Sequence, residues 1–261
     1  MLDAAIGKQP QLETVSVCEA GPIHQRNEDR IAIVAASDHN LPGKGTLLIV
    51  ADGMGGMNSG EKASEIVVTE LPTLYLQSPA ANSLESLVQS FMEVNRKVYE
   101  ESERLPAGET MGSTVVASVI LGEWLITANV GDSRAYLVHD GRIRQLTRDH
   151  SLRKKFFSPF LTTFQDYSHV LTQAIGPRAT VSPHINVSKL EEGDTILLCS
   201  DGLTAVLTDA KINDILQTHP PTKAVEQLMA NVAAKEGDDD VSIIVSKVVK
   251  VPTTAEVCMP L

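Results

Sequence analysis

Residues 48–56 read LIVADGMGG, an apolar run followed by one acid and a group of glycines. The β-branched apolar run predicts a buried strand. Asp52 stands at the end of that strand, and the glycines let the backbone come close to whatever the acid binds, because glycine has no side chain. Asp-Gly is also a common turn pair, so a strand ending in a simple turn explains the same residues. The rest of the chain must decide between these two interpretations.

The pairing of a carboxylate with glycine at a strand end recurs along the chain. It is found at Asp52-Gly53, Gly131-Asp132, Asp201-Gly202 and the GDDD of residues 237–240, and Glu28-Asp29 precedes another strand. Each place taken alone fits a turn. Carboxylates that converge in space repel one another unless cations neutralise them. An all-oxygen cluster without cysteine favours hard ions such as Mg²⁺, Mn²⁺ or Ca²⁺.

Composition narrows the classes of function. The chain has 261 residues, 43% of them hydrophobic, and a net charge of −11, which disfavours nucleic acid and anionic membranes as partners. No apolar run approaches the roughly 18 residues of a membrane span, and residues 1–11 do not resemble a signal peptide. Three scattered cysteines suggest neither a disulfide framework nor a zinc site. A reducing, cytoplasmic location is expected.

The element pattern predicts an α+β fold, an antiparallel β-sandwich layered by helices. Strands are expected at 14–18, 31–34, 48–52, 112–120, 124–130, 134–138, 143–146, 182–187, 195–200 and 241–246, and helices at about 59–70, 83–104, 208–218 and 221–235. Pro72 is expected to bend or end the first helix, because proline lacks the donor needed in mid-helix. Residues 12–250 form one domain in this interpretation, with an irregular insertion at 149–180 and a loose tail at 251–261.

Five motifs carry a family resemblance. In order and spacing, DGMGG (52–56), GDSRA (131–135), SDGL (200–203) and DDVS (239–242), together with NED (27–29), resemble the metal-dependent protein phosphatases of the PPM (type 2C) family. The resemblance covers about residues 14–248. Met54, where animal members carry histidine, resembles the bacterial branch.

The resemblance implies two stacked antiparallel sheets with helices on both outer faces and a centre of two Mn²⁺ or Mg²⁺ ions. Asp52 would bridge both ions, Asp201 and Asp239 would complete one site, and the other would use Glu28 and the Gly53 carbonyl through waters. Asp29 would stand behind these ligands. Bacterial members often hold a third ion, for which Asp132 is the family's ligand, sharing Asp201.

The implied activity is hydrolysis of phosphoserine and phosphothreonine in proteins, opposed by a cognate Ser/Thr kinase, in a monomeric enzyme. Phosphomonoester hydrolysis is among the slowest uncatalysed reactions. In the implied mechanism, a water between the two ions would attack phosphorus directly, without a phosphoenzyme. The absence of a Cys-x5-Arg loop from the sequence agrees with this. Two alternatives stay open: a pseudophosphatase that binds phosphoproteins without turnover, and a metallophosphatase for small phosphate esters.

Several residues depart from the family's pattern. The arginine that grips the substrate phosphate is replaced here by His24, and Arg26, two positions on, would face the same side of an extended segment. Three alternatives stay open: Arg26 makes that contact with phosphate, His24 makes it, or the metals bind the phosphate without either side chain. Asp240 replaces the usual asparagine and either strengthens metal binding or is simply solvated. His39 is a candidate general acid, a role that Met54 cannot fill, or else an ordinary exposed loop histidine.

The insertion at 149–180 corresponds to the family's flap, which is thought to influence substrate choice. It holds several phenylalanines and begins with the basic residues 153–155. These features fit either a docking site for protein substrates or a small local core beneath the loop.

Overall fold

The computed structural model describes residues 9–22, 26–38, 41, 43–55, 59–80, 82–152, 170–235 and 237–252. The strands are β1 (Gln11–Glu19), β2 (Asp29–Val34), β3 (Thr46–Gly55), β4 (Met111–Ser113), β5 (Val115–Leu121), β6 (Trp124–Val130), β7 (Arg134–His139), β8 (Arg142–Gln145), β9 (His184–Lys189), β10 (Thr195–Cys199) and β11 (Val241–Lys250). The helices are α1 (Ser59–Gln77), α2 (Ser83–Ser102), α3 (Asp201–Thr204), α4 (Asp209–Thr218) and α5 (Pro221–Ala234), with a 3-10 turn at Ala36–Asp38.

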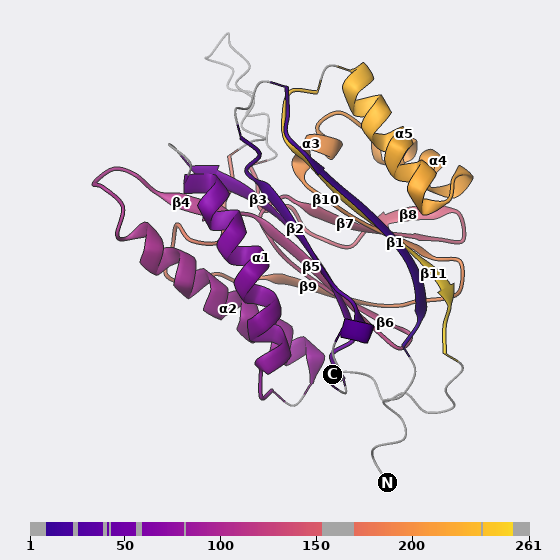
Figure 1. Cartoon of the computed structure of the whole chain (residues 1–261), viewed down its shortest axis with the longest axis horizontal. Helices are drawn as coiled ribbons and strands as arrows, with labels where there is room; N and C mark the ends of the chain where they lie inside the picture. Colours follow the sequence, from indigo (N-terminus) through magenta and orange to yellow (C-terminus); the bar gives the residue numbers. More distant parts are fainter. Residues whose placement is uncertain are drawn as a thin grey trace, which may run out of the picture.

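The strands form two antiparallel sheets that stack face to face. One sheet has the order β1-β11-β10-β7-β8; the other has the order β2-β3-β5-β6-β9, with β4 paired to β3. Helices α1 and α2 cover one outer face, and α4 and α5 cover the other (Figure 1). Three hydrophobic clusters separate these layers, one between the sheets and one under each helical layer. The predicted sandwich with helices on both sides is confirmed.

The stretch at 46–51 lies at the middle of this arrangement. Strand β3 pairs with β2 on one side and β5 on the other. Leu48 and Val50 belong to the cluster between the sheets, whereas Leu47, Ile49 and Ala51 face the α1–α2 layer. All five are fully buried. A strand buried on both faces must be apolar at every position, which is why this run does not alternate.

Helix α1 corrects the expectation that the first helix could end at Pro72. The proline lies inside the helix, which continues to Gln77 instead of ending near residue 70. On either side of it, Leu71 and Tyr75 are fully buried in the cluster that α1 shares with β3. Most helical stability in proteins comes from such packing, so a buried face can extend a helix past a residue of poor propensity.

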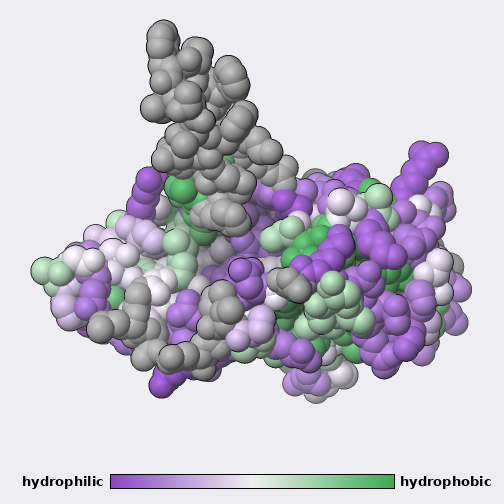
Figure 2. All heavy atoms as spheres, turned by 90° about the horizontal axis from the view of Figure 1, so that it is seen from above, coloured by the Kyte–Doolittle hydropathy of each residue, from purple (hydrophilic) through white to green (hydrophobic). Residues whose placement is uncertain are grey.

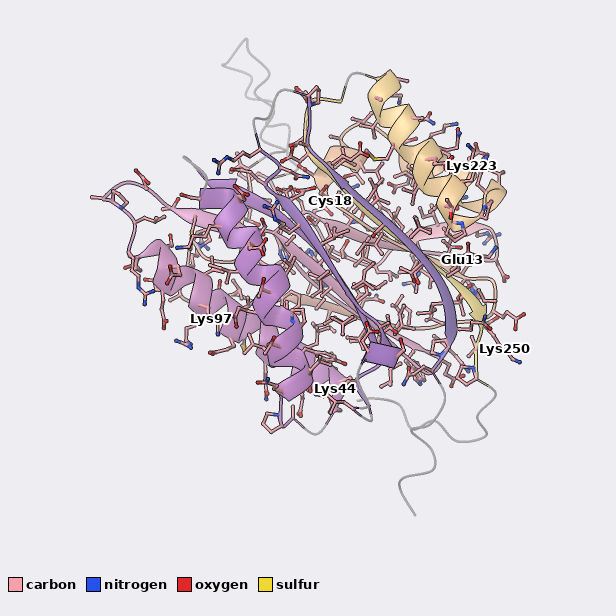
Figure 3. All side chains as sticks on the ribbon, in the orientation of Figure 1. Glu13, Cys18, Lys44, Lys97, Lys223 and Lys250 are labelled. Carbon is pink, nitrogen blue, oxygen red and sulfur yellow. The ribbon has the colours of Figure 1, made fainter. Side chains whose placement is uncertain are left out.

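Helix α2 has an N-terminal cap, and two lysines connect it to neighbouring elements. The Asn82 side chain accepts a hydrogen bond from the Glu85 amide (2.8 Å), the usual N-terminal cap. Lys97 pairs with Glu70 of α1 at 2.8 Å, and Lys44, just before β3, donates to the Ser86 hydroxyl at 2.8 Å (Figure 3). The α1–α2 layer is thus anchored to the strand that carries Asp52.

Other differences from the sequence-based expectation are local. The segment expected as one strand at 112–120 divides into β4 and β5, and the short helix α3 after β10 was not expected. Most of the 149–180 insertion and most of the tail lie outside the described residues. Hydrophilic residues cover much of the face seen in Figure 2, in keeping with the charge of −11. Within the described part of the chain, no helix is long and apolar enough to cross a membrane.

Candidate functional site

Acidic strand ends from both sheets meet at one end of the sandwich. Asp29 in β2 lies directly opposite Asp52 in β3. Ser200, the last residue before Asp201, donates a hydrogen bond from its hydroxyl to the Asp29 carboxylate at 2.6 Å and accepts one from the Ser242 amide at 2.9 Å. Because Ser200 and Ser242 belong to one sheet and Asp29 to the other, this bond joins the two sheets beneath the acids.

The carboxylates are close enough to change one another's ionisation. Desolvation raises the pKa of Asp52 well above its usual range, and the charges of Asp29, Asp201, Asp239 and Asp132 raise it further. Desolvation likewise raises the pKa of Asp29 to about 7, although the hydrogen bond from Ser200 opposes this. The pKa of Asp132 also rises to about 7, through desolvation and then through Asp201. Like charges held this close favour a bound cation.

Glu28 reaches the same place from the segment before β2. Its carbonyl accepts hydrogen bonds from the Gly53 amide (3.1 Å) and the Ser64 hydroxyl (2.5 Å). Its carboxylate lies where a side chain at Gly60 would begin, 2.6 Å from that Cβ position, and the Gly53 carbonyl carbon is 2.8 Å from the same point. Only glycine at residue 60 lets the Glu28 carboxylate approach the Gly53 carbonyl. No motif in the sequence had pointed to Gly60.

Asp240 is buried, with 4% of its surface exposed, so the expectation that it is simply solvated is wrong. One carboxylate oxygen accepts the Gly21 amide at 2.8 Å and the other accepts the Glu28 amide at 2.7 Å. The side chain therefore clips together the two ends of the segment between β1 and β2. Its position also fixes Asp239, because the Asp240 amide donates to the Asp239 carboxylate at 2.9 Å.

Asp132 stands in the turn between β6 and β7, beside a second buried network. Arg134 donates to the Asp149 carboxylate from Nη2 at 2.7 Å and from Nε to both oxygens at 3.1 Å, and its Nη1 donates to the Tyr136 hydroxyl at 2.9 Å. The Tyr136 hydroxyl in turn donates to Asp209 at the start of α4. The network joins the Asp132 turn to the helical layer and to the start of the 149–180 insertion.

The Arg134–Asp149 pair gives a first prediction. Asp149→Asn leaves the Arg134 charge without its carboxylate in a largely buried position, so we expect the free energy of unfolding to fall by about 3 kcal/mol. Tyr136→Phe, which removes one hydroxyl from the same network, should cost only about 1 kcal/mol. Urea denaturation of both variants measures these changes. Equal decreases in the free energy of unfolding would show that the ion pair contributes no more to stability than the Tyr136 hydroxyl.

Of the two candidates for binding the substrate phosphate, only Arg26 lies among the described residues. His24 lies outside the described residues, as does His39. Arg26 is described; its side chain is 61% exposed, and one guanidinium nitrogen lies 3.3 Å from Glu61. Glu61 also forms an ion pair with Arg30 at 2.8 Å, so its carboxylate is divided between the two arginines.

The donor chemistry at this end of the sandwich fits divalent cations. All the converging side chains are carboxylates, and their pKa values are raised first by desolvation and then by one another's charge. Among the described residues, no three acidic, histidine or cysteine side chains are placed to hold an ion by themselves. Waters and backbone oxygens such as the Gly53 carbonyl would have to complete the coordination of a hard ion, which such ions accept.

Comparisons with known proteins agree with this geometry. The family model described as "Protein phosphatase 2C" matches residues 24–245. The serine/threonine phosphatase stp of Listeria innocua is 32% identical over 238 residues, covering 87% of this chain and 92% of that protein. The S. agalactiae serine/threonine phosphatase structure has a TM-score of 0.79 at 31% identity and covers 91% of this chain and all of that one.

A further solved structure contains metal. It is the catalytic domain of the serine/threonine protein phosphatase PstP in complex with two manganese ions, with a TM-score of 0.76, 29% identity and coverage of 92% of this chain and 99% of that one. The ordered acids, the stacked sheets and the match over most of the chain lead to one conclusion: this chain belongs to the protein phosphatase 2C family, the type 2C or PPM phosphatases.

Proposed function

We propose that this chain is a metal-dependent phosphatase of phosphoserine and phosphothreonine in proteins. The observation that carries the proposal is the convergence of buried acids from both sheets around Asp52, whose pKa is raised by desolvation and then by the charges of Asp29, Asp201, Asp239 and Asp132. Buried like charges are costly, and a binding function for cations explains why they are kept together.

The roles of the acids follow from their places. Asp52 lies at the centre and would bridge two ions, Mn²⁺ or Mg²⁺, with Asp201 and Asp239 on one and Glu28 and the Gly53 carbonyl on the other. Asp132, with Asp201, would serve a third ion. Divalent cations bound here would lower the pKa of a water and screen the phosphoryl oxygens. Asp29, held by Ser200 and paired with Asp52 across the strands, orients Asp52 from behind.

The described cysteines are unsuited to act as nucleophiles. Desolvation raises the pKa of Cys199 to about 12 and also raises that of Cys18, so neither forms a thiolate near neutral pH. Direct attack by water, without a phosphoenzyme, is therefore the route proposed for residues 12–250. We extend the proposal to a monomeric cytoplasmic enzyme that opposes a Ser/Thr kinase.

The test compares p-nitrophenyl phosphate with a phosphoserine peptide, each with Mn²⁺ and with excess chelator. Hydrolysis of both substrates should depend on the metal and stop with the chelator. The peptide should have the higher kcat/KM. Peptide binding without turnover would instead identify a pseudophosphatase, and a preference for small esters would identify a different substrate class.

Arg26 is proposed to bind the substrate phosphate. Because a hydrogen bond to a charged group contributes about 1.5–3 kcal/mol, Arg26→Ala should raise the KM for the phosphopeptide roughly tenfold or more and leave kcat nearly unchanged. Arg96→Ala, which removes an exposed arginine from α2, is the control and should leave KM unchanged. An unchanged KM in Arg26→Ala would leave His24 or the metals to bind phosphate.

A further inference from the structure

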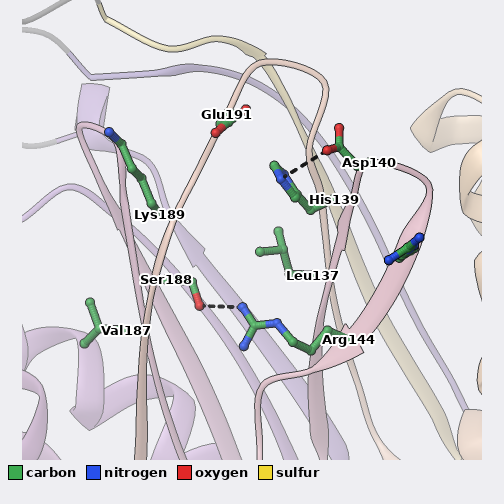
Figure 4. Close-up of a pocket in the computed structure, with 9 residues that line it drawn as sticks. Leu137, His139, Asp140, Arg144, Val187, Ser188, Lys189 and Glu191 are labelled. Carbon is green, nitrogen blue, oxygen red and sulfur yellow. Dashed lines mark hydrogen bonds and ion pairs between the residues drawn. The ribbon is translucent and has the colours of Figure 1, made fainter.

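A groove lies on the flank of the sandwich, at the end of β7 away from Asp132. Its volume is about 630 Å³, and it opens between the β7–β8 hairpin and β9 (Figure 4). Strand β8 is the last strand of one sheet, and β9 is the last strand of the other. The groove is therefore the place where the space between the two sheets opens to solvent.

The lining of the groove changes from apolar to charged at this edge, with Arg142, Arg144 and Lys189 on its walls and the acids Asp140 and Glu191 beside them. Leu137 belongs to the hydrophobic cluster between the sheets, and its cross-strand partner is Arg144. His139 pairs with Arg142 in the same way. Because directly paired residues share one face of a sheet, both arginines lie on the face that elsewhere forms the core. At this edge, the guanidinium groups of Arg142 and Arg144 occupy positions where hydrophobic side chains would otherwise seal the space between the two sheets.

Arg144 is held in place from the opposite sheet. Its Nη2 donates a hydrogen bond to the Ser188 hydroxyl of β9 at 3.0 Å (Figure 4), and that hydroxyl donates to the Asn186 side chain at 2.7 Å. With one nitrogen fixed, the guanidinium is oriented across the groove before any ligand arrives. Such preorganisation reduces the entropy lost on binding.

Arg142 and Arg144 are the groove's basic side chains with no acidic partner among the described residues, whereas the acids Asp140 and Glu191 lie at its His139 end. Neither Arg142 nor Arg144 forms an ion pair with a described residue, although both lie in a chain of net charge −11. Lys189 also lines the groove and pairs with Glu123 at its rim. The charges could serve only to keep a sheet edge from pairing with another chain. That role does not require the bond between Arg144 and Ser188.

We propose that this groove binds an extended acidic segment of the phosphoprotein substrate. The proposal rests on the proposed phosphatase activity and adds a determinant of substrate choice distant from the acids. The two arginines would pair with carboxylates, and Leu137 would accept the aliphatic parts of the segment. The six residues of β7 separate the groove from the Asp132 turn by roughly 20 Å, so the acidic segment should lie about six to eight residues from the phosphoserine.

The test uses phosphoserine peptides that carry four glutamates, or four glutamines, seven residues before or after the phosphoserine. In the wild type, one of the glutamate peptides should have a KM about five- to tenfold lower than its glutamine counterpart. The Arg142→Gln/Arg144→Gln double variant should lose this preference and keep its kcat/KM for p-nitrophenyl phosphate. The Arg96→Gln/Arg104→Gln variant removes the same charge from the α2 surface and should keep the preference. Equal KM values in the wild type, or a preference that survives in the groove variant, would overturn the proposal.

A second measurement needs neither the variants nor turnover. A fluorescent peptide with the same four glutamates and no phosphate should bind the wild-type protein, and it should compete with the acidic phosphopeptide without slowing hydrolysis of p-nitrophenyl phosphate. Binding in a protein that hydrolyses nothing would support the groove and reject the phosphatase proposal. Hydrolysis without such binding would do the reverse.

Discussion

Asp52→Asn is expected to abolish phosphatase activity, with kcat/KM falling by about 10³-fold or more, because Asp52 is the proposed shared ligand of two cations that together contribute several kcal/mol to catalysis. Asparagine keeps the shape of the side chain and its place opposite Asp29 but removes the charge. Steady-state assays with p-nitrophenyl phosphate over a range of Mn²⁺ concentrations measure the loss. Recovery of full activity at high Mn²⁺ would mean that Asp52 is not the shared ligand.

The same variant should have the opposite effect on stability. In the metal-free protein, the folded-state pKa values of Asp29 and Asp132 lie near 7, above their unfolded values. The folded state then binds more protons than the unfolded state, so stability falls as pH rises from about 4 to about 7. Removing the Asp52 charge relieves part of this repulsion. With chelator present, Asp52→Asn should melt at a higher temperature than the wild type at pH 8, and the two should converge near pH 4.

Thermal unfolding with chelator at several pH values measures this effect. The control is Asp214→Asn, which removes one exposed carboxylate from α4 and should leave the pH dependence unchanged. A lower melting temperature for Asp52→Asn than for the wild type at pH 8 would contradict mutual repulsion among the acids. A gain in stability with a loss of activity is expected of a side chain kept for function.

Asp240→Ala is expected to impair both stability and activity. It leaves the Gly21 and Glu28 amides without their acceptor in a buried position, at a cost of about 1–3 kcal/mol for each group. Freed from this clip, Glu28 should hold its ion less well. We expect a higher Mn²⁺ requirement and a kcat reduced by about 10- to 100-fold, the range seen when groups that orient metal ligands are removed.

Asp240→Asn separates this positioning role from a direct role in binding metal. Asparagine, which the family usually has at this position, keeps one acceptor oxygen and should restore much of the stability and the Mn²⁺ affinity. A ligand carboxylate would not be replaced in this way. If Asn and Ala raise the Mn²⁺ requirement equally while Asn alone restores the melting temperature, Asp240 acts as a charge near the ions instead of as a clip.

The sandwich and its acids were predictable because their signals are local. A doubly buried strand reads as an unbroken apolar run, and residues 47–51 show that pattern directly. Acids beside glycine mark strand ends, and the family motifs then give their order. The end of α1 could not be predicted from Pro72, because the packing of Leu71 and Tyr75 decides how far the helix continues and no local rule contains it.

The role of Asp240 could not be predicted from its neighbours in the sequence. Its two partners, the amides of Gly21 and Glu28, are 219 and 212 residues away along the chain. An acid next to other acids suggests a ligand or a solvated charge, and only the fold shows that its oxygens are already used. Gly60 and Ser200 are similar cases, because each matters through a residue distant in sequence.

Counting bound Mn²⁺ shows directly whether Asp52 serves two ions. Equilibrium dialysis with wild-type protein should find at least two ions per chain, and Asp52→Asn should lose both high-affinity sites together, because one carboxylate is proposed to serve both. Asp214→Asn should bind as the wild type does. If Asp52→Asn binds the same number of ions with the same affinity, Asp52 is not the shared ligand of the metal site.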